Sequence, residues 1–380
     1  MSTRRFAIVT PNFYPRVCGI GDNSLRLAQE LQRRQHEVMI FSRTPAERHP
    51  EAANLPVHGA AGRLPSLVAQ HLVGAIEGFR PTEIVLQYTN QLWNAWRFGS
   101  FAPALLMRRL QRTGARLTVI AHEPFLSWLS RSDLLIAGLL QRAQLAMLVR
   151  QCQRFFVTTD TRAGIVAPLL RMAGAVAPEV IRIGSNALPI ERRPDPSGGP
   201  KIGFFSTAAV GKRYDVVLDA FERIVAEIPA AELVLMGDLG PPHHPNVRAV
   251  HDAVSRHPAG AKIRLTGRLS LVEVARETAT LDLYLFPMET GANTRSSTLP
   301  GALGSGIPTV AVRGVETDLA LFRDGENVAF ADEMTGPAFA TAALRLLRDP
   351  SAAARVGEGG RRLYAEQLSW ARIGDRLLAD

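Results

Sequence analysis

Short apolar runs alternate with helical patterns along almost the whole chain, and this alternation narrows the fold more than any other feature. In the first half, the apolar runs lie at 6–11, 38–42, 83–89, 117–123, 155–160 and 180–186. Amphipathic, helix-like stretches separate them, at 24–38, 64–79, 100–113, 132–153 and 161–173. Strands that alternate with helices of this length predict βα units around a parallel sheet.

The alternation stops at 187–200, ALPIERRPDPSGGP, and then starts again. A stretch so rich in proline, glycine and charge is typical of an interdomain linker, and 380 residues are too many for one ordinary core. The second series has strand-like runs at 201–207, 232–238, 262–267, 282–287 and 309–312, and helical patterns at 212–227, 245–256, 270–279, 297–305 and 336–348. We expect an α/β protein with Rossmann-like, doubly wound domains at 1–188 and 201–366, a linker at 189–200, and a helix at 367–380 that returns to the first domain.

Composition narrows the cellular setting. Apolar residues make up 46% of the chain, and no apolar run reaches the roughly 18 residues that a membrane-spanning helix needs. The first residues lead directly into a strand-like run and lack the apolar core of a signal peptide. Two cysteines, Cys18 and Cys152, fit no metal-binding spacing. We expect a soluble cytoplasmic protein without a bound metal ion.

The net charge of +9 is unevenly distributed. Residues 1–190 contain 22 arginines, no lysine and 11 acidic residues, which leaves a net charge of −2 for the rest of the chain. Nucleic acid is a weak candidate partner, because the chain has no helix-turn-helix, zinc-finger or RNP-type signature. Phosphate-bearing substrates, or peripheral contact with the anionic inner face of the plasma membrane, fit the basic half better.

The stretch 125–154 is strongly apolar, with Arg131, Arg142, Arg150 and Arg154 interspersed. Such a helix can lie on anionic lipid, or it can pack into the core with a solvated arginine edge, which is the more common arrangement. Four aromatic side chains also have two possible interpretations. They can line a site for a sugar or an aromatic aglycone, or they can simply belong to the core: Tyr88, Trp93, Trp96 and Trp128.

The loops that follow the strands are the places to look for a site, because ligands of open α/β sheets bind beyond the carboxyl ends of the strands. Gly19 and Gly21 open a helix whose free N–H groups favour an anion. A tight turn capped by Asp22 or Asn23 explains the same residues equally well. Ser24 stands where the GxGxxG fingerprint needs its third glycine, so a dinucleotide cofactor is not expected.

Three more strand ends carry polar groups. His122 and Glu123 end one run, where the histidine can bind a sugar hydroxyl or phosphate, or pair with a neighbouring loop. Lys212 begins the helical stretch 212–227, and Arg295 stands at the start of 297–305. Cations oppose the helix dipole at such positions unless an anion lies between them, although solvated basic side chains are the plainer explanation. Together the two cations predict a diphosphate site.

Eight segments, in this order, resemble retaining glycosyltransferases of the GT-B fold, the family-4-like group called glycosyl transferases group 1. They cover nearly the whole chain: YPRVCGIGDNSLRLAQELQRRQHEV, AHEP, IGSNALP, KRYDVVLDAF, LVLMGD, LTGRLSLVEVARETATLDLYLFP, GALGSGIPTVAV and SWARIGDRLL. The resemblance implies two Rossmann-like domains facing across a cleft, the first for the acceptor and the second for a nucleotide-diphosphate sugar. Gly19 and Gly21 then correspond to the loop at the donor diphosphate, His122 to a histidine near the transferred sugar, and Lys212 to the diphosphate lysine.

The chain departs from the family pattern at several positions. Ser206 replaces an arginine, whose charge Arg295 is a candidate to supply. The family also has two glutamates eight positions apart; Asn293 and Gly301 stand there, with Glu289 near the first. A subset of the family with R-x-G-[ST]-L resembles RSSTL here. The expected donor-binding residues are Gly19, Gly21, Ser206, Lys212, Gly237, Arg268, Glu289, Asn293, Arg295, Ser296, Ser297 and Thr298.

The resemblance implies a retaining hexosyltransferase that acts on a saccharide or lipid-linked saccharide in polysaccharide or glycoconjugate biosynthesis. No DxD-like pair follows a strand, which predicts metal-independent catalysis, and the leaving phosphate itself can take the acceptor proton. The catalytic candidates are His122, Lys212, Arg295, Asp22 and Glu123. A nucleotide-sugar 2-epimerase of the same fold and a non-catalytic sugar-nucleotide-binding protein are the alternatives.

Overall fold

The computed structural model describes residues 3–16, 18–60, 65–93, 98–125, 135–193, 198–208 and 211–379, without the side chains of 65–69. The chain forms two compact units. Unit 1 consists of Met1–Arg182 and Ile373–Asp380, and unit 2 consists of Ile183–Arg372. The stretch 189–200, predicted as a linker, belongs to unit 2.

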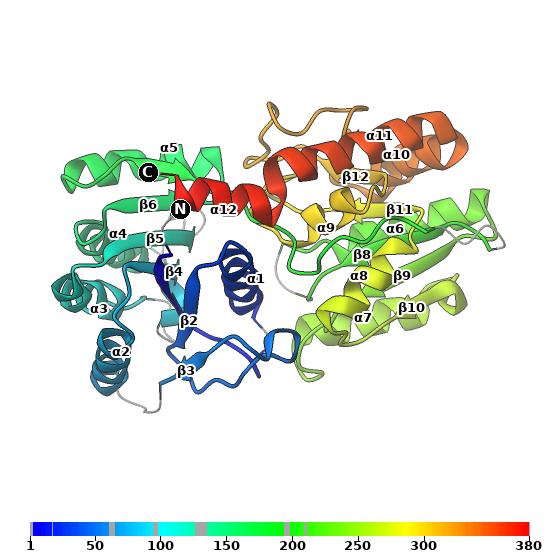
Figure 1. The fold of residues 1–380 in the computed structure, drawn as a ribbon. Coiled ribbons are helices and arrows are strands. Elements are labelled where there is room, and N and C mark those ends of the chain that lie inside the picture. Colours follow the sequence, from blue (N-terminus) through cyan, green and yellow to red (C-terminus); the bar gives the residue numbers. More distant parts are fainter. Residues whose placement is uncertain are drawn as a thin grey trace. The chain divides into compact units, whose positions relative to one another are not determined.

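Unit 1 contains a parallel sheet whose described strands follow the order β3-β2-β1-β4-β5-β6-β7 (Figure 1). The strands are β1 Arg5–Thr10, β2 Glu37–Ser42, β3 Val57–Gly59, β4 Glu83–Thr89, β5 Arg116–Glu123, β6 Arg154–Val157 and β7 Pro178–Val180. The helices between them are α1 Gly19–Arg33, α2 Pro65–Phe79, α3 Ala102–Leu110, α4 Leu135–Val149 and α5 Asp160–Met172.

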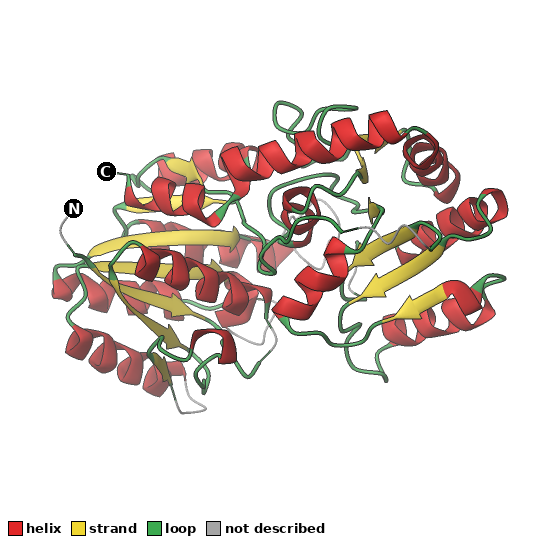
Figure 2. Cartoon of the chain, turned by 45° about the vertical axis from the view of Figure 1, so that its right-hand side comes forward, coloured by secondary structure: helices red, strands yellow, loops and turns green. Residues whose placement is uncertain are grey.

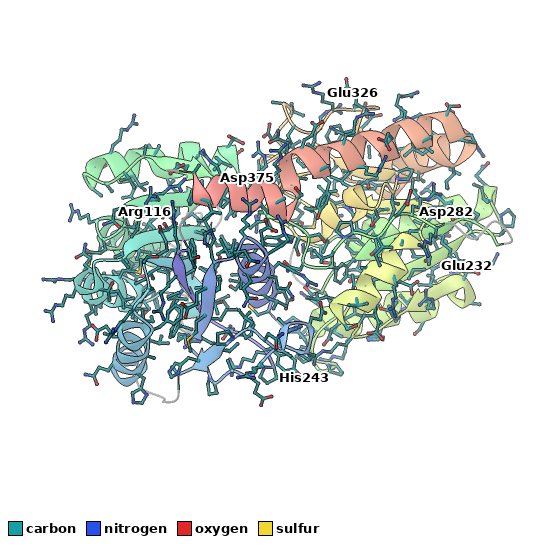
Figure 3. The ribbon with its side chains drawn as sticks, viewed as in Figure 1. Arg116, Glu232, His243, Asp282, Glu326 and Asp375 are labelled. Atoms are coloured by element: carbon teal, nitrogen blue, oxygen red, sulfur yellow. The ribbon has the colours of Figure 1, made fainter. Side chains whose placement is uncertain are left out.

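The two faces of the unit 1 sheet are covered by different helices, because successive strand residues point to opposite sides. Leu117, Val119 and Ala121 of β5 belong to a buried cluster that also contains side chains of α2, α3, α4 and α5. Helix α1 covers the other face together with the end of the last helix, α12 Trp370–Leu378. Asp375 of α12, labelled in Figure 3, lies 2.8 Å from Arg34, which follows α1 directly.

The C-terminal end of α12 is fixed by a buried arginine of unit 1. Arg154 donates hydrogen bonds to the carbonyl groups of Leu377 and Ala379, at 2.7 and 2.6 Å, and pairs with Glu179 at 2.9 Å. A cation at a helix C-terminus satisfies carbonyl groups that have no partner within the helix. The predicted final helix and its return to the first domain are therefore confirmed, since the residues from Ile373 onward belong to unit 1.

Unit 2 has a second parallel sheet, drawn in yellow in Figure 2, and its described strands follow the order β10-β9-β8-β11-β12-β13. The strands are β8 Lys201–Phe205, β9 Glu232–Met236, β10 Ile263–Leu265, β11 Leu283–Phe286, β12 Thr309–Val312 and β13 Ala329–Ala331. The helices are α6 Tyr214–Glu227, α7 Pro245–Arg256, α8 Leu271–Ala279, α9 Thr298–Gly304, α10 Gly336–Arg348 and α11 Pro350–Leu363.

Two large buried clusters lie on opposite sides of the unit 2 sheet. Leu283 and Leu285 of β11 pack with α6, α7 and α10, whereas Tyr284 and Phe286 pack with α9. Helices on both faces of two parallel sheets confirm the predicted α/β, doubly wound fold class.

The predicted strand 180–186 is largely absent, because β7 ends at Val180. The chain beyond β7 bonds elsewhere: the Ile183 N–H donates to the Thr294 carbonyl, and the Trp370 indole donates to the Ser185 carbonyl at 2.7 Å. Both bonds lie within unit 2. This part of the segment therefore leaves the unit 1 sheet.

Helix α4 exposes apolar side chains on one side. Leu135, Ile136 and Leu139 are 50%, 66% and 52% exposed. The Arg142 guanidinium lies 4.1 Å from the Phe125 ring centre. The expected arginine edge is incomplete, because Arg154 is buried under α12, while Arg131 lies outside the described residues. Over the part of the chain that is described, no helix has both the length and the apolar character needed to cross a bilayer.

Candidate functional site

Lys212 lies just before α6, at the carboxyl end of the unit 2 sheet. Its backbone pairs with Met288 in an isolated antiparallel bridge, and α6 begins at Tyr214, two residues later than predicted. The ammonium group lies 3.2 Å from the Met288 sulfur, which is a weak acceptor. No carboxylate forms an ion pair with Lys212 among the residues that the structure describes. The cation therefore stands outside the helix, and the described part of the chain gives it no carboxylate counter-ion.

Lys212 is held near a second cation. Burial, and after it the positive charge of Arg295, lower the pKa of Lys212 to about 8. Both effects disfavour the charged ammonium group, and an anion bound beside it would reverse them. The structure thus brings together the two cations that the sequence proposed as one anion site.

Arg295 is oriented by a carboxylate that the sequence did not reveal. One guanidinium nitrogen lies 3.2 Å from Glu316 Oε1, and the two side chains are 30% and 15% exposed. Glu316 comes from the loop after β12, and its backbone N–H donates to the Thr290 carbonyl at 3.0 Å. Nothing in the spacing along the chain indicates this pair, because it depends on how two separate loops pack.

Asn293 holds the turn that carries Arg295. Its amide nitrogen donates to Thr290 Oγ1 at 3.0 Å and to the Gly291 carbonyl at 2.8 Å, and its oxygen accepts from the Arg295 backbone N–H. The side chain is 1% exposed. The side-chain amide of Asn293, which stands at the position of the first family glutamate, therefore makes its hydrogen bonds within the turn itself.

The hydroxyl groups after Arg295 form a short local network. Helix α9 begins at Thr298, three residues beyond the arginine, and Ser297 precedes it without a capping side-chain bond. Ser296 Oγ lies 2.9 Å from Thr298 Oγ1. Capping by Ser297 therefore does not account for this cluster.

The other unit 2 candidates lie around the same edge of the sheet. Ser206 is buried, and its carbonyl accepts from the Tyr214 hydroxyl at 2.8 Å. Gly237 has φ of 105°, and a Cβ atom there would lie 2.9 Å from the Phe205 ring. The side chains of Arg268 and Glu289 are exposed.

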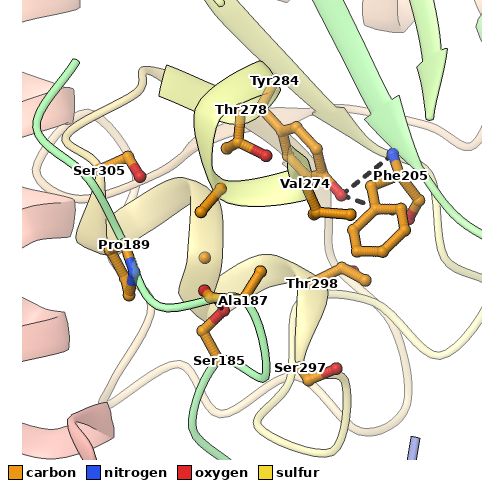
Figure 4. Close-up of a pocket in the computed structure, with 12 residues that line it drawn as sticks. Ser185, Ala187, Pro189, Phe205, Val274, Thr278, Tyr284, Ser297, Thr298 and Ser305 are labelled. Carbon is orange, nitrogen blue, oxygen red and sulfur yellow. Dashed lines mark hydrogen bonds between the residues drawn. The ribbon is translucent and has the colours of Figure 1, made fainter. Parts of the chain in front are cut away.

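A small pocket lies beside the start of α9 (Figure 4). Hydroxyl-bearing and apolar side chains from β8, α8, β11, α9 and the segment 185–189 line it: Ser185, Ala187, Pro189, Phe205, Val274, Ala275, Thr278, Tyr284, Ser297, Thr298, Gly301 and Ser305. At Gly301, the position of the second family glutamate, a Cβ atom would lie 2.9 Å from Ser185 Oγ. The wall of the pocket is therefore closed against a larger side chain unless Ser185 moves.

In unit 1, Gly19 and Gly21 form the first turn of α1, as predicted. The residue that precedes the helix is Cys18, whose side chain makes no capping bond, and Asp22 lies within the first turn. A Cβ atom at Gly21 would lie 3.0 Å from the Asn12 carbonyl oxygen. Close packing against the loop after β1 therefore requires this glycine.

His122 is the second-last residue of β5 and lies beside Gln87 of β4, a residue that the sequence did not single out. The Nε2 atom of His122 lies 2.6 Å from Gln87 Oε1, and the His122 carbonyl accepts from Arg162. Burial, and after it the Arg162 charge, lower the pKa of His122 to about 4. The imidazole is therefore neutral at pH 7. With Nε2–H donated to Gln87, its Nδ1 atom is an acceptor. Glu123 follows it at the strand end, half-buried.

Two of the four aromatic candidates belong to the core. Tyr88 and Trp93 are 1% and 4% exposed in the unit 1 cluster. The Tyr88 hydroxyl accepts from Asn90 at 2.7 Å. Trp96 and Trp128 lie outside the described residues. Across the described ranges, no group of three or more His, Cys, Asp or Glu side chains is placed to hold a metal ion, and metal independence stays a prediction.

Comparisons with known proteins show which family and which solved structures the chain is similar to. Residues 199–349 match the family described as glycosyl transferases group 1. The chain is similar to sucrose-phosphate synthase from Thermosynechococcus elongatus, with a TM-score of 0.73, 16% identity and coverage of 98% of this chain and 97% of that one. It is similar to HepE of Anabaena in complex with UDP, with a TM-score of 0.72, 14% identity and 98% of each chain covered.

A provisionally assigned UDP-N-acetylglucosamine 2-epimerase from Listeria monocytogenes is also similar, with a TM-score of 0.65, 13% identity and coverage of 99% of this chain and 95% of that one. No curated protein matches the chain by sequence. At such identities the likeness to solved structures establishes the fold alone.

Proposed function

We propose that this chain, which has the GT-B fold, is a retaining glycosyltransferase that moves a hexosyl group from a nucleotide-diphosphate sugar to a saccharide or lipid-linked saccharide. The observation that carries the proposal is Lys212, an ammonium group without a carboxylate partner among the described residues and with Arg295 beside it. The family match over 199–349 includes both residues, and the UDP complex of HepE supports a nucleotide donor.

Lys212 and Arg295 bind the donor diphosphate. As the bond to the sugar breaks, negative charge grows on the departing phosphate, and fixed cations stabilise it without rearranging. Loss of one such preorganised group typically raises the barrier by about 3 to 4 kcal/mol. Glu316 keeps Arg295 in place before the donor arrives, since the two side chains already pair in the free protein.

His122 contributes a neutral hydrogen-bonding group. Because its pKa is low, the imidazole is uncharged at pH 7, and the hydrogen bond to Gln87 sets the orientation of the ring. The Nδ1 atom then accepts a hydrogen bond from a hydroxyl group of the transferred sugar. The leaving phosphate takes the acceptor proton, and Asp22 and Glu123 are the carboxylates to test as alternative bases.

The acceptor is bound by unit 1, and the exposed side of α4 makes peripheral contact with an anionic membrane at the inner face of the plasma membrane. Leu135, Ile136 and Leu139 supply the apolar contact. Such a surface would place the protein beside a lipid-linked acceptor. Polysaccharide or glycoconjugate biosynthesis is the corresponding process.

Incubation with UDP-, GDP-, ADP- and dTDP-hexoses and a mixture of saccharide acceptors tests the proposal. We expect a glycosylated product that keeps the anomeric configuration of the donor, as read by proton NMR, together with released nucleoside diphosphate. Epimerised donor would instead identify a 2-epimerase, the second candidate that the Listeria monocytogenes likeness supports. Binding without turnover would identify a non-catalytic sugar-nucleotide-binding protein.

A further inference from the structure

A second pair of cations lies in unit 1, where the loops after β1 and β2 meet. Arg43 follows β2 directly, and its backbone N–H donates to the Thr10 carbonyl at the end of β1, at 3.0 Å. Arg16 closes a turn after β1 by donating its N–H to the Phe13 carbonyl at 3.1 Å. The two strands are parallel neighbours, so both arginines stand at the carboxyl edge of the sheet.

Neither guanidinium has an ion-pair or side-chain hydrogen-bond partner within the described part of the chain. The Nε atom of Arg43 is buried and has no acceptor among the residues that the structure describes. Another arginine close by in the sequence behaves differently, since Arg26 of α1 is paired with Glu51 at 2.7 Å. Burial, and after it the positive charge of Arg16, lower the pKa of Arg43. A partly buried cation next to another cation is unfavourable unless an anion joins them.

The neighbouring start of α1 favours the same kind of ligand. The helix runs from Gly19 to Arg33, and its preceding residue, Cys18, makes no capping side-chain bond. Backbone N–H groups at a helix start carry partial positive charge, which adds to that of the arginines. Guanidinium groups match phosphate in shape, because their N–H donors lie in one plane and can bind two oxygens at once.

We propose that Arg16 and Arg43 bind a phosphate group, distinct from the diphosphate assigned to Lys212 and Arg295. The identity of its carrier rests on the proposed function: the donor diphosphate is assigned to Lys212 and Arg295 of unit 2, so this phosphate is assigned to the acceptor. The start of α1 at Gly19 is then assigned to the acceptor phosphate as well, and not to the donor diphosphate as the resemblance implies. The acceptor is therefore a phosphate ester, either a soluble sugar phosphate or a lipid-linked one. This assignment gives a specific use to the excess of arginine in the first half of the chain.

Inorganic phosphate is the first probe, titrated calorimetrically into the full chain that has been saturated with a nucleoside diphosphate. We expect phosphate to bind even when unit 2 is already occupied by the nucleoside diphosphate. The substitution Arg43→Met should weaken phosphate binding by about 10- to 100-fold, the range for a lost hydrogen bond to a charged group. Arg48→Met is the matched control, since Arg48 is exposed in the same loop. Equal phosphate affinity in the Arg43→Met variant and in the wild type overturns the inference, as does complete displacement of phosphate by the nucleoside diphosphate.

Transfer assays then identify the carrier, with a hexose, a hexose phosphate and a lipid phosphate in vesicles as acceptors. We expect Arg43→Met to raise the KM of a phosphorylated acceptor by about tenfold or more, with kcat nearly unchanged and partial recovery in Arg43→Lys. The nucleoside diphosphate affinity of each variant reports on folding. A wild type that binds no nucleoside diphosphate contradicts the proposed function. A wild type that transfers sugar equally well to phosphorylated and plain acceptors contradicts this inference alone.

Discussion

Lys212 holds its proton less tightly in the folded chain than it would in water. Burial and Arg295 both disfavour the charged form, and the nearby carboxylate of Glu316 is paired with Arg295. A bound dianion supplies the missing counter-charge and raises the pKa again. At the scale of single residues, the site is therefore a charge arrangement completed by its ligand.

This arrangement predicts a pH dependence of nucleoside diphosphate affinity. The free protein has Lys212 charged below its pKa of about 8 and neutral above it. Binding requires the ammonium form, so affinity is highest below pH 8 and falls as the pH rises, by up to about tenfold per pH unit. Calorimetric titration between pH 6.5 and 9.5 measures this. Lys212→Met should lack the decline, and a flat wild-type profile would speak against the assignment.

The position of Arg295 depends on two loops that pack against each other. The loop after β11 donates the Ala292 N–H to the Val312 carbonyl, and the loop after β12 donates the Glu316 N–H to the Thr290 carbonyl. Gly291 packs directly against Gly314 and Thr317 of the loop after β12. At the scale of elements, the site is thus formed by loop contacts at the carboxyl edge of one sheet.

Replacing Gly291 should disturb this contact and the site together. Its φ is 78°, and a Cβ atom there would lie 2.4 Å from the Gly314 backbone nitrogen. We expect Gly291→Ala to lower the free energy of unfolding by about 3 kcal/mol, from backbone strain and overpacking combined. Chemical denaturation measures the loss. Gly267→Ala is the control, with φ of 66° but nothing within 4 Å of the added atom. Equal losses in the two variants would refute the role of the contact.

Local signals explain which elements could be predicted. The helices at 245–256 and 336–348 have the predicted bounds, since each combines a proline in its first turn with a capping side chain before it. The three-residue strands β3 and β13 were missed because neither shows an alternating pattern, and α11 was missed although Asp349 and Pro350 give it the same start signal.

The candidate site was predictable only in part, because only some of its residues are marked by local sequence features. Lys212 and Arg295 could be found because each is a cation just before a helix, which is a local feature. Glu316, Gln87 and Arg43 could not, because their importance comes from contacts between loops or strands that are distant in sequence. The resemblance also gave no sign that the Asn293 amide is used within its own turn.

At the scale of the whole molecule, charge separates the two halves of the chain. Residues 1–190 carry a net charge of +11 and the rest carry −2. The basic half also includes α4, which exposes several apolar side chains instead of packing them into the core. Basic charge and exposed apolar side chains together are what an anionic lipid surface binds.

Vesicle sedimentation tests this membrane contact. We expect the chain to bind vesicles that contain anionic lipid, and to release as salt screens the charges. The double substitution Ile136→Ser with Leu139→Ser should weaken binding by at least about tenfold, since two large side chains no longer enter the lipid. Leu319→Ser, an equally exposed position in unit 2, is the control. Equal binding of neutral and anionic vesicles would argue against the proposal.

The most direct test of the diphosphate site is calorimetric binding of UDP, GDP, ADP and dTDP to the wild type, Lys212→Met and Lys262→Met at pH 7. Lys262 is exposed, and among the described residues its ammonium group bonds a backbone carbonyl of unit 2 and no carboxylate, so it serves as the matched control. We predict that one of these nucleotides binds the wild type and Lys262→Met equally, and binds Lys212→Met at least about tenfold more weakly. Undiminished affinity in Lys212→Met would contradict the account.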